Sequence, residues 1–309
     1  METKHKPVLL KQVLETLKVK PGGTYADLTL GGGGHSFAIV EAMQGKGVML
    51  VLDQDPAAIA EFKLKLIEKG WQETTVGIYK LKQLQIYIEE GSFRELDTYF
   101  NKHKMKNLDG ILADLGISTD QLEDEMRGFS FQKSGELDMR MSPGLNVKAS
   151  DLLNGLYKQE LIKLFGIYGD IEFAPQLVNE ILKERAKEPI NTTKQLRAVI
   201  QKVVPYSRRK QVRNPDSRVF QALRIAVNDE LNALREMLPQ AFAALADKGR
   251  LAVISFHSGE DRLVKQFYKE IENKKTGRII TKEAIGPTES ELRANPRSRS
   301  AKMRVLEKN

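Results

Sequence analysis

Residues 25–36 read YADLTLGGGGHS, an apolar run that ends in four consecutive glycines. Glycine loses more backbone freedom on folding than any other residue, so four in a row need a physical reason. A glycine loop that follows a strand and precedes a helix lets a nucleotide approach the backbone closely. Residues 24–30 are expected to form that strand and residues 36–44 that helix. The stretch predicts a nucleotide-binding turn.

Further apolar strands are expected at 47–53, 108–116 and 249–256, with a periodic helix at 57–70. Strands that alternate with helices favour a doubly wound, mainly parallel sheet. The fold class predicted is therefore α/β.

The last two of these strands are separated by residues 115–248, whereas a simple strand–helix–strand unit takes about 30 residues. Most of this gap has helical patterning, with a capping box at Thr192 and Gln195 and a break or kink expected at Pro239. We expect an inserted helical domain at 135–212, between core segments 1–134 and 213–309. Residues 277–286 and 301–307 are expected to form a hairpin at a sheet edge.

The chain of 309 residues contains no cysteine, which excludes disulfides, thiolate metal sites and a cysteine nucleophile. Its four histidines are scattered, so no metal site is expected. The sequence has no signal-peptide core and no apolar run of about 20 residues, so we expect a soluble cytoplasmic protein without a membrane partner.

Lysine and arginine exceed the acidic residues by 49 to 41. So modest an excess fits ordinary solvated charge as well as a polyanionic partner. The basic residues cluster at 206–218 and 292–308, and this clustering favours nucleic acid.

The identity of the cofactor depends on the residues around the glycines. Asp53 ends the next predicted strand, where a carboxylate accepts hydrogen bonds from ribose hydroxyls. Ser36 stands where a dinucleotide site has its third glycine or an alanine, and Asp27 suits an ammonium group better than a pyrophosphate. These features favour S-adenosylmethionine over NAD. Gly33 and Gly34 are expected to admit its methionine and ribose portions, while Gly31 serves the turn.

Two further residues are candidates for the same site. Asp114 ends the strand at 108–116 and is expected to face the crevice of Gly33 and Asp53, although a helix cap or turn role is also open. Phe93 fits the adenine region or, equally, a hydrophobic core.

The chain resembles the bacterial methyltransferases that use S-adenosylmethionine to modify the exocyclic N4 of a cytosine in small-subunit ribosomal RNA. The resemblance implies a Rossmann-like class I methyltransferase core whose inserted helical domain recognises RNA. It also implies cofactor contacts for Gly33, Gly34, His35, Asp53, Phe93, Asp114 and Gln121. The segments that carry it span residues 5–304: HKPVLLKQVL, DLTLGGGGHS, LDQDPAAI, LDGILADLGIS, RGFSF, LDMRM, FQALRIAVNDEL, ISFHSGEDR and NPRSRSAKMR.

Transfer to nitrogen agrees with the absence of cysteine, because methylation at cytosine C5 commonly uses a cysteine nucleophile. Asp114 and the Leu115 carbonyl are candidate proton acceptors, while a purely cofactor-orienting role for Asp114 is equally open. His257 and Asp261 are expected at the same crevice. His257 is a candidate catalytic residue, with a structural role as the alternative.

The segments RGFSF (127–131), LDMRM (137–141) and 206–218 are candidates for RNA contact, with packing as the alternative for the first two. The expected partner is small-subunit ribosomal RNA, either free or in the assembled subunit, and a homodimer is left open. The rival readings are an NAD-dependent oxidoreductase and a non-catalytic RNA-binding module.

Overall fold

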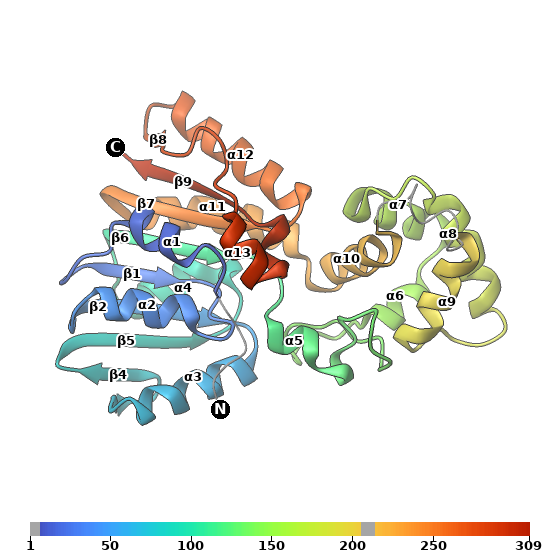
Figure 1. Ribbon diagram of the computed structural model, residues 1–309, viewed down its shortest axis with the longest axis horizontal. Helices are drawn as coiled ribbons and strands as arrows, with labels where there is room; N and C mark the ends of the chain where they lie inside the picture. The colour runs from blue at the N-terminus through green and yellow to red at the C-terminus, as the bar shows by residue number, and fades with distance from the viewer. Residues whose placement is uncertain (1–6, 205–213) are drawn as a thin grey trace. The chain divides into compact units, whose positions relative to one another are not determined.

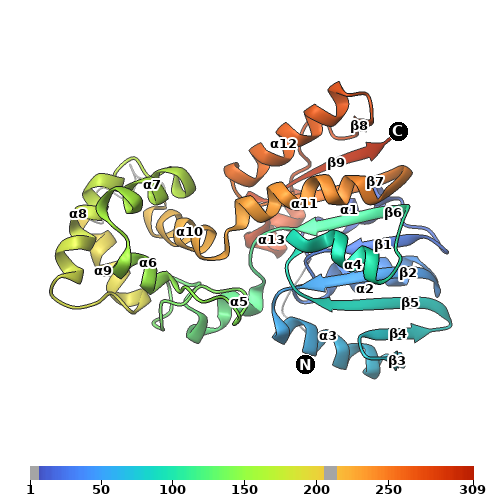
Figure 2. The same cartoon turned by 180° about the vertical axis from the view of Figure 1, so that it is seen from behind.

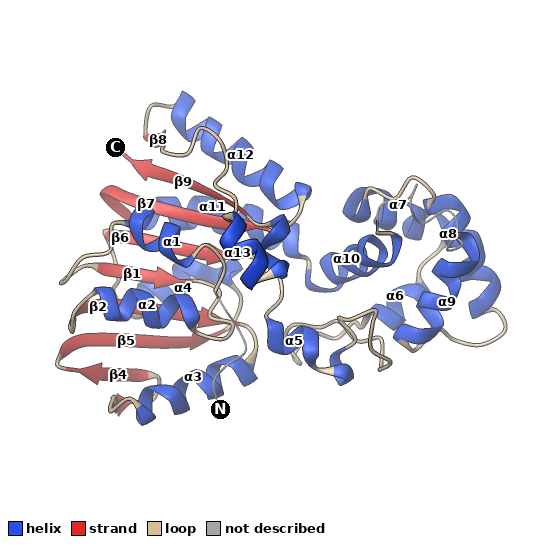
Figure 3. Cartoon of the chain, viewed as in Figure 1, coloured by secondary structure: helices blue, strands red, loops and turns tan. Residues whose placement is uncertain are grey.

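The computed structural model describes residues 7–204 and 214–309. The chain divides into two compact units. One, the core unit, is the chain through Ser118 together with Leu231–Asn309, and the other, the helical unit, is Thr119–Glu230. Figure 3 shows that the strands of the sheet belong to the core unit.

The described part of the core unit contains a nine-stranded sheet in the order β3-β4-β5-β2-β1-β6-β7-β9-β8 (Figure 1). The five strands from β5 to β7 run parallel to one another, and the strands outside them pair antiparallel. The strands in chain order are β1 (Thr24–Asp27), β2 (Lys46–Asp53), β3 (Gln72–Thr75), β4 (Ile78–Leu81), β5 (Gln83–Glu90), β6 (Leu108–Asp114), β7 (Leu245–Ser255), β8 (Gly277–Ile279) and β9 (Lys302–Lys308).

Helices cover both faces of this sheet. Helices α1 (Leu10–Leu17), α2 (Gly34–Ala42) and α3 (Pro56–Glu68) pack on the face seen in Figure 1. Figure 2 shows the opposite face, which is covered by α4 (Leu96–Lys102), α11 (Glu230–Ala244) and α12 (Ser258–Asn273). The short elements η1 (Phe93–Glu95), α13 (Glu289–Ala294) and η4 (Pro296–Ser300) complete the described core unit.

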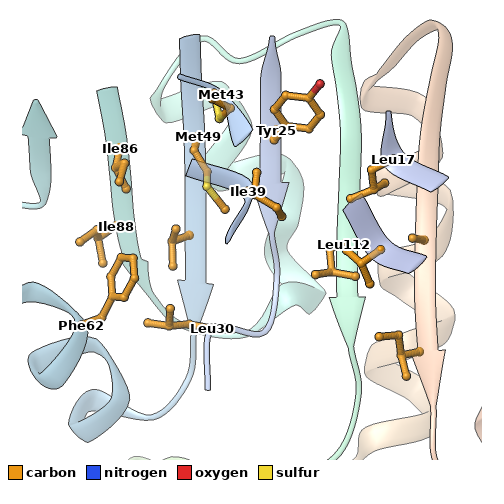
Figure 4. Packing of buried hydrophobic residues seen from close by; sticks show 14 of the residues in the cluster. Leu17, Tyr25, Leu30, Ile39, Met43, Met49, Phe62, Ile86, Ile88 and Leu112 are labelled. Carbon is orange, nitrogen blue, oxygen red and sulfur yellow. The ribbon is translucent and has the colours of Figure 1, made fainter. Parts of the chain in front are cut away.

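The sequence of β2 explains why the sheet is covered twice. Successive side chains of a strand point to opposite faces. Met49 and Val51 accordingly lie in the first core cluster, while Leu50 and Leu52 lie in the second. All four are fully buried. Figure 4 shows the first cluster, in which Met49 lies among residues of β1, β5, α2 and α3.

The predicted doubly wound, mainly parallel α/β fold is confirmed. The four predicted strands correspond to β1, β2, β6 and β7, and the C-terminal hairpin corresponds to β8 and β9 at a sheet edge. The sequence analysis did not identify β3, β4 and β5 (residues 72–90). Their alternating pattern, seen in QLQIYIEE, was the available signal.

The helical unit consists of short helices joined by loops. The capping box predicted at Thr192 is present: its Oγ1 accepts from the Gln195 amide at 3.2 Å, and Gln195 Oε1 accepts from the Thr192 amide at 3.0 Å. The described elements are α5 (Thr119–Glu123), η2 (Glu125–Arg127), α6 (Ala149–Gly155), α7 (Lys158–Gly169), α8 (Ala174–Arg185), α9 (Thr193–Val203) and α10 (Pro215–Asn228).

The helical unit extends beyond the predicted insertion of 135–212 at its N-terminal side, and it includes α10 at its C-terminal side. The side-chain amide of Asn228 shows one reason why α10 belongs to the helical unit. Its Nδ2 donates to the Met139 carbonyl at 2.8 Å, and its Oδ1 accepts from the Met141 amide at 2.7 Å. α10 also packs against α7. The predicted boundary at 212 falls outside the described residues.

Of the break or kink expected at Pro239 in the helical stretch 216–247, the break is wrong, and the kink stays a prediction. The helical stretch is interrupted at Asp229 instead. This residue adopts a left-handed backbone with φ +49° and separates α10 from α11. Pro239 lies inside α11. Asp visits the left-handed region more readily than most residues do, so Asp229 was a possible stop signal.

A buried ion pair joins the neighbouring strands β7 and β9. Arg250 Nε donates to Glu307 Oε2 at 2.9 Å, and both side chains are less than a tenth exposed. Arg278, which is two-thirds exposed, donates to the other carboxylate oxygen. Burial opposes the charge of Glu307, but the hydrogen bonds and charges of both arginines lower the pKa of this carboxyl.

We predict that Arg250→Met lowers the free energy of unfolding by roughly 3–5 kcal/mol, because the buried Glu307 charge loses its buried partner. The control is Arg278→Gln, whose exposed ion pair contributes about 1 kcal/mol or less. Urea denaturation at neutral pH measures both variants. Equal losses would mean that burial of the pair does not determine its contribution.

Candidate active site

Three aspartates end three neighbouring strands at the centre of the sheet. Asp27, Asp53 and Asp114 are the last residues of β1, β2 and β6, and β1 pairs with both of the other strands. These strands are parallel, so their carboxyl ends meet at one edge of the sheet. The chain goes from β1 to β2 on one side, while β6 lies on the other. This is the topological switch point at which doubly wound sheets bind ligands.

The glycine run turns the chain from β1 into α2. Gly31 and Gly33 have positive φ angles of +49° and +79°, and Gly33 caps α2. A Cβ at Gly33 would lie 2.8 Å from the Phe62 ring, and one at Gly34 would lie 3.0 Å from Pro7. Packing and backbone conformation therefore already require glycine at 33, and Pro7 leaves little room at 34. The role of Gly33 and Gly34 in admitting the cofactor stays a prediction.

Asp27 is fully buried. Its carboxylate accepts from Ser36 Oγ at 2.6 Å and from the Thr29 amide at 3.2 Å. Burial raises the pKa of Asp27 to about 6, against the opposing effects of the His35 charge and the Ser36 hydrogen bond. Thr29 also connects two strand ends, because its Oγ1 accepts from the Asp114 amide at 2.6 Å.

Asp53 holds the other side of the turn. One carboxylate oxygen accepts from the Gly31 amide at 2.8 Å and the other from the Asp55 amide at 2.9 Å. Burial also raises the pKa of Asp53 to about 6. The side chain keeps partial exposure, so its oxygens retain lone pairs for further donors.

His35 and Asp114 lie beside each other at this edge. His35 Nε2 lies 3.4 Å from Asp114 Oδ2, and the imidazole is only 5% exposed. Burial lowers the pKa of His35, but Asp114 and the charges of Asp27 and Glu291 outweigh burial and raise it. Among the described residues, neither ring nitrogen of His35 nor Asp114 Oδ1 has an aligned hydrogen-bond partner. Buried polar atoms without partners suit a site that receives a polar ligand.

The other predicted residues lie in different settings. Phe93 begins η1 after β5 and packs, half-buried, on the second core cluster. The Gly91 amide just before it donates to the Asp53 carbonyl, so this segment meets the end of β2. Gln121 is buried in α5 of the helical unit, so the core unit does not include it.

His257 caps α12 instead of standing free. Its Nδ1 accepts from the Glu260 amide at 3.4 Å, and Glu260 Oε2 accepts from the His257 and Phe256 amides. Asp261 pairs with Arg304, whose Nε donates to Asp261 Oδ1 at 2.6 Å. These contacts favour the structural alternative for His257.

Thr29 and Ser36 are site residues that the sequence analysis missed. Ser36 was considered only as the missing third glycine of a dinucleotide site, yet its hydroxyl holds the buried Asp27. A hydroxyl residue two positions after an aspartate is the available signal for Thr29, since aspartate commonly bonds the backbone two residues on.

The arginines of RGFSF and LDMRM are held within the helical unit. Arg127 donates to the carbonyls of Arg140 and Met141, while Arg140 forms a two-point pair with Asp138. Leu137, Met139 and Met141 are buried. These contacts favour packing for both segments, and RNA contact by them stays a prediction. Most of the predicted basic segment 206–218, namely 206–213, lies outside the described residues.

No helix in the described ranges is long and apolar enough to cross a membrane.

The raised pKa values of Asp27 and Asp53 predict a pH-dependent stability. Both exceed the ordinary 3.8, so the folded state binds these protons more tightly than the unfolded state does. The stability that this provides is complete below about pH 4 and is lost as the pH rises through about 6. We expect the stability of Asp53→Asn, relative to the unmodified protein, to increase between these pH values and then level off.

Urea denaturation of the ligand-free protein from about pH 4 to about pH 8 measures this difference. The control is Asp247→Asn, because Asp247 is an exposed aspartate of the same unit. A pH-independent difference for Asp53→Asn would contradict the raised pKa of this carboxyl.

The chain resembles known proteins over its whole length. A ribosomal RNA small subunit methyltransferase H from Heliobacterium mobile is 42% identical over 324 residues, which cover 100% of both chains. The same-named protein of Thermomicrobium roseum is 42% identical, covering 100% of this chain and 94% of that one. A solved rRNA methylase from Streptococcus thermophilus is 10% identical, with coverages of 98% and 97% and a TM-score of 0.45, too remote to bear on function. The model of the MraW methylase family matches residues 2–309, and the chain belongs to this family.

Proposed function

We propose that this protein transfers a methyl group from S-adenosylmethionine to the exocyclic N4 of a cytosine in small-subunit ribosomal RNA. The observation that carries the proposal is the full-length match to a methylase family. The relatives' name adds the small ribosomal subunit as the site of action. Acting on ribosomal RNA, the protein would work in the cytoplasm.

The residues at the carboxyl edge fit this cofactor. S-adenosylmethionine supplies, when bound, an electrophilic methyl group on a positively charged sulfur, and it also carries an ammonium group. Asp27, Asp53 and Asp114 give the edge a negative potential that suits such a cation. The same carboxylates would repel the pyrophosphate of NAD, which disfavours the oxidoreductase reading.

We infer individual roles from the same geometry. Asp53 would accept hydrogen bonds from ribose hydroxyls, because its two oxygens are already oriented by the Gly31 and Asp55 amides. Gly33 and Gly34 would line the methionine and ribose portions, and Phe93 the adenine. A cofactor contact by Gln121 remains a prediction.

We infer that Asp114 receives the proton of the reacting amine. The bound cofactor would supply the methyl group and keep the electrons of its carbon–sulfur bond. The Asp114 carboxylate would accept the proton that N4 gives up on bonding to the methyl carbon. His35 Nε2 lies 3.4 Å from Asp114 Oδ2 and would hold this carboxylate in place for the transfer. The chain's remaining task is alignment, because reacting groups about 3–3.5 Å apart need little further activation.

A nitrogen target agrees with the absence of cysteine from the sequence. The sequence has no cysteine, so it has no thiolate for the covalent attack on C6 that C5 methylation commonly uses. The activity assay below distinguishes free RNA from the assembled subunit as the substrate. Sedimentation tests whether the enzyme is a homodimer.

We expect the protein to form N4-methylcytidine when incubated with S-adenosylmethionine and unmodified small-subunit particles or their RNA. Nucleoside mass spectrometry of the digested RNA identifies the product, and sedimentation of the enzyme gives its oligomeric state. The finding of 5-methylcytidine, or of no methylated cytidine in either substrate, would overturn the proposal.

We predict different kinetic losses for two carboxylate variants. Asp53→Asn should weaken binding of S-adenosylhomocysteine by roughly 10–100-fold, because a charged acceptor contributes about 1.5–3 kcal/mol. Asp114→Asn should lower kcat by about 100-fold or more with a smaller loss of affinity, because it removes a proton acceptor.

Calorimetry gives the affinities and single-turnover assays give the rates. The two variants are controls for each other, because each replaces one carboxylate at the same edge. An Asp114→Asn enzyme that binds weakly but turns over normally would leave this residue only its cofactor-orienting role.

A further inference from the structure

The basic residues of the C-terminal segment 292–308 fall into two groups. The first group maintains the fold. Arg304 pairs with Asp261 through two nitrogens, and Lys308 Nζ donates to the Ala243 and Leu245 carbonyls at 2.9 and 2.7 Å. These two residues are therefore not available to a partner.

The second group is exposed. We call it the basic rim, and it consists of Arg293, Arg297, Arg299 and Lys302. Two of its members form long ion pairs: Arg293 lies 3.7 Å from Glu289, and Lys302 lies 3.7 Å from Asp261. Exposed pairs of this kind contribute little, so such pairs hold these cations weakly.

A buried serine fixes the backbone of the rim. Ser298, between two of the arginines, is fully buried. Its hydroxyl donates to the Asn295 carbonyl at 2.7 Å, and its carbonyl accepts from the Ala301 amide at 2.8 Å. Arg297 and Arg299 thus project from a fixed turn. A fixed turn reduces the entropy lost when a partner binds.

The rim lies at the same end of the sheet as the candidate active site. Lys302 begins β9 opposite Ser255, the last residue of β7. One residue further along, Met303 pairs with Ile254, and Ile254 pairs with Asp114. Strand register therefore places the start of β9 two strands from Asp114.

Helix α13 gives a second connection between the rim and the site. Glu291 Oε1 accepts from the Leu9 amide at 2.6 Å, and Pro7 lies against Gly34. The charge of Glu291 also raises the pKa of His35. Figures 1 and 2 both show α13 at the end of the sheet where the arrowhead of β6 lies.

Arginine pairs with phosphate through two parallel hydrogen bonds, and several exposed arginines on a fixed turn suit a phosphate backbone. In the helical unit, Arg185 and Arg218 donate to carbonyls, at Leu153 and Gly169 among others. We propose that the basic rim of the core unit binds the phosphates of the substrate RNA beside the reacting cytosine. This inference rests on the proposed function.

The test compares Arg297→Gln/Arg299→Gln with the unmodified protein. Its matched control is Lys269→Gln/Lys274→Gln, which removes two exposed charges, one in α12 and one at its C-cap, away from its N-terminal end. The probes are unmodified small-subunit particles and RNA transcribed from the small-subunit gene. Methyl transfer is measured at several salt concentrations, and S-adenosylhomocysteine affinity by calorimetry.

We expect the rim variant to raise the KM for RNA about tenfold, with kcat and S-adenosylhomocysteine affinity unchanged. The log–log salt slope of RNA binding should shrink by about 1.4, since each lost single-strand phosphate contact removes about 0.7. The control variant should match the unmodified protein.

Two results would overturn the inference while leaving the proposed function intact. In one, the rim variant keeps the RNA KM and salt slope of an active unmodified protein. In the other, the control variant loses as much as the rim variant does. A rim variant that also loses S-adenosylhomocysteine affinity would overturn it too, because its effect would then be on the site. An unmodified protein that methylates neither probe would instead refute the proposed function.

Discussion

The site depends on a buried carboxylate at the end of the central strand. Asp27 has no exposed surface, and burial of an ionised group is unfavourable unless hydrogen bonds and charges compensate. Ser36 on α2 and Thr29 in the turn provide those hydrogen bonds, so the turn is fixed from both sides. The same Thr29 accepts from the Asp114 amide, which joins β1 to the end of β6. One buried charge thus sets the positions of the glycine turn and two strand ends.

The sequence predicted the location of the acidic side chains that stand at strand ends. Asp53 and Asp114 follow apolar runs, and the parallel sheet places the ends of such runs at one edge. The sequence does not show which of several possible partners a side chain at a strand end will bind. His257 follows a strand in the same way, but it caps α12. The pattern of apolar residues predicts where a strand ends, whereas the hydrogen-bond partner of a side chain depends on the tertiary structure.

The same distinction explains the helical unit. The capping box at Thr192 is local, since its partner is three residues away, and the sequence predicted it. The extent of the unit is not local. The Asn228 amide reaches the backbone of Met139 and Met141, almost 90 residues earlier, and nothing in the spacing of these residues indicates that contact. The helix break at Asp229 depends on one left-handed residue, whereas the more visible proline at 239 does not end the helix.

The charges at the carboxyl edge set a problem for a substrate that is itself a polyanion. Three aspartates suit a cationic cofactor, but they repel RNA phosphates that come within about 10 Å, the screening length at 0.1 M salt. Cations near the edge are needed if RNA is to approach, and the described arginines of RGFSF and LDMRM are held by carbonyls and Asp138. The arginines at 297 and 299 are exposed on the core unit itself. If the cytosine base reaches the acidic edge while its phosphates stay on the basic rim, the RNA phosphates are kept away from the three aspartates.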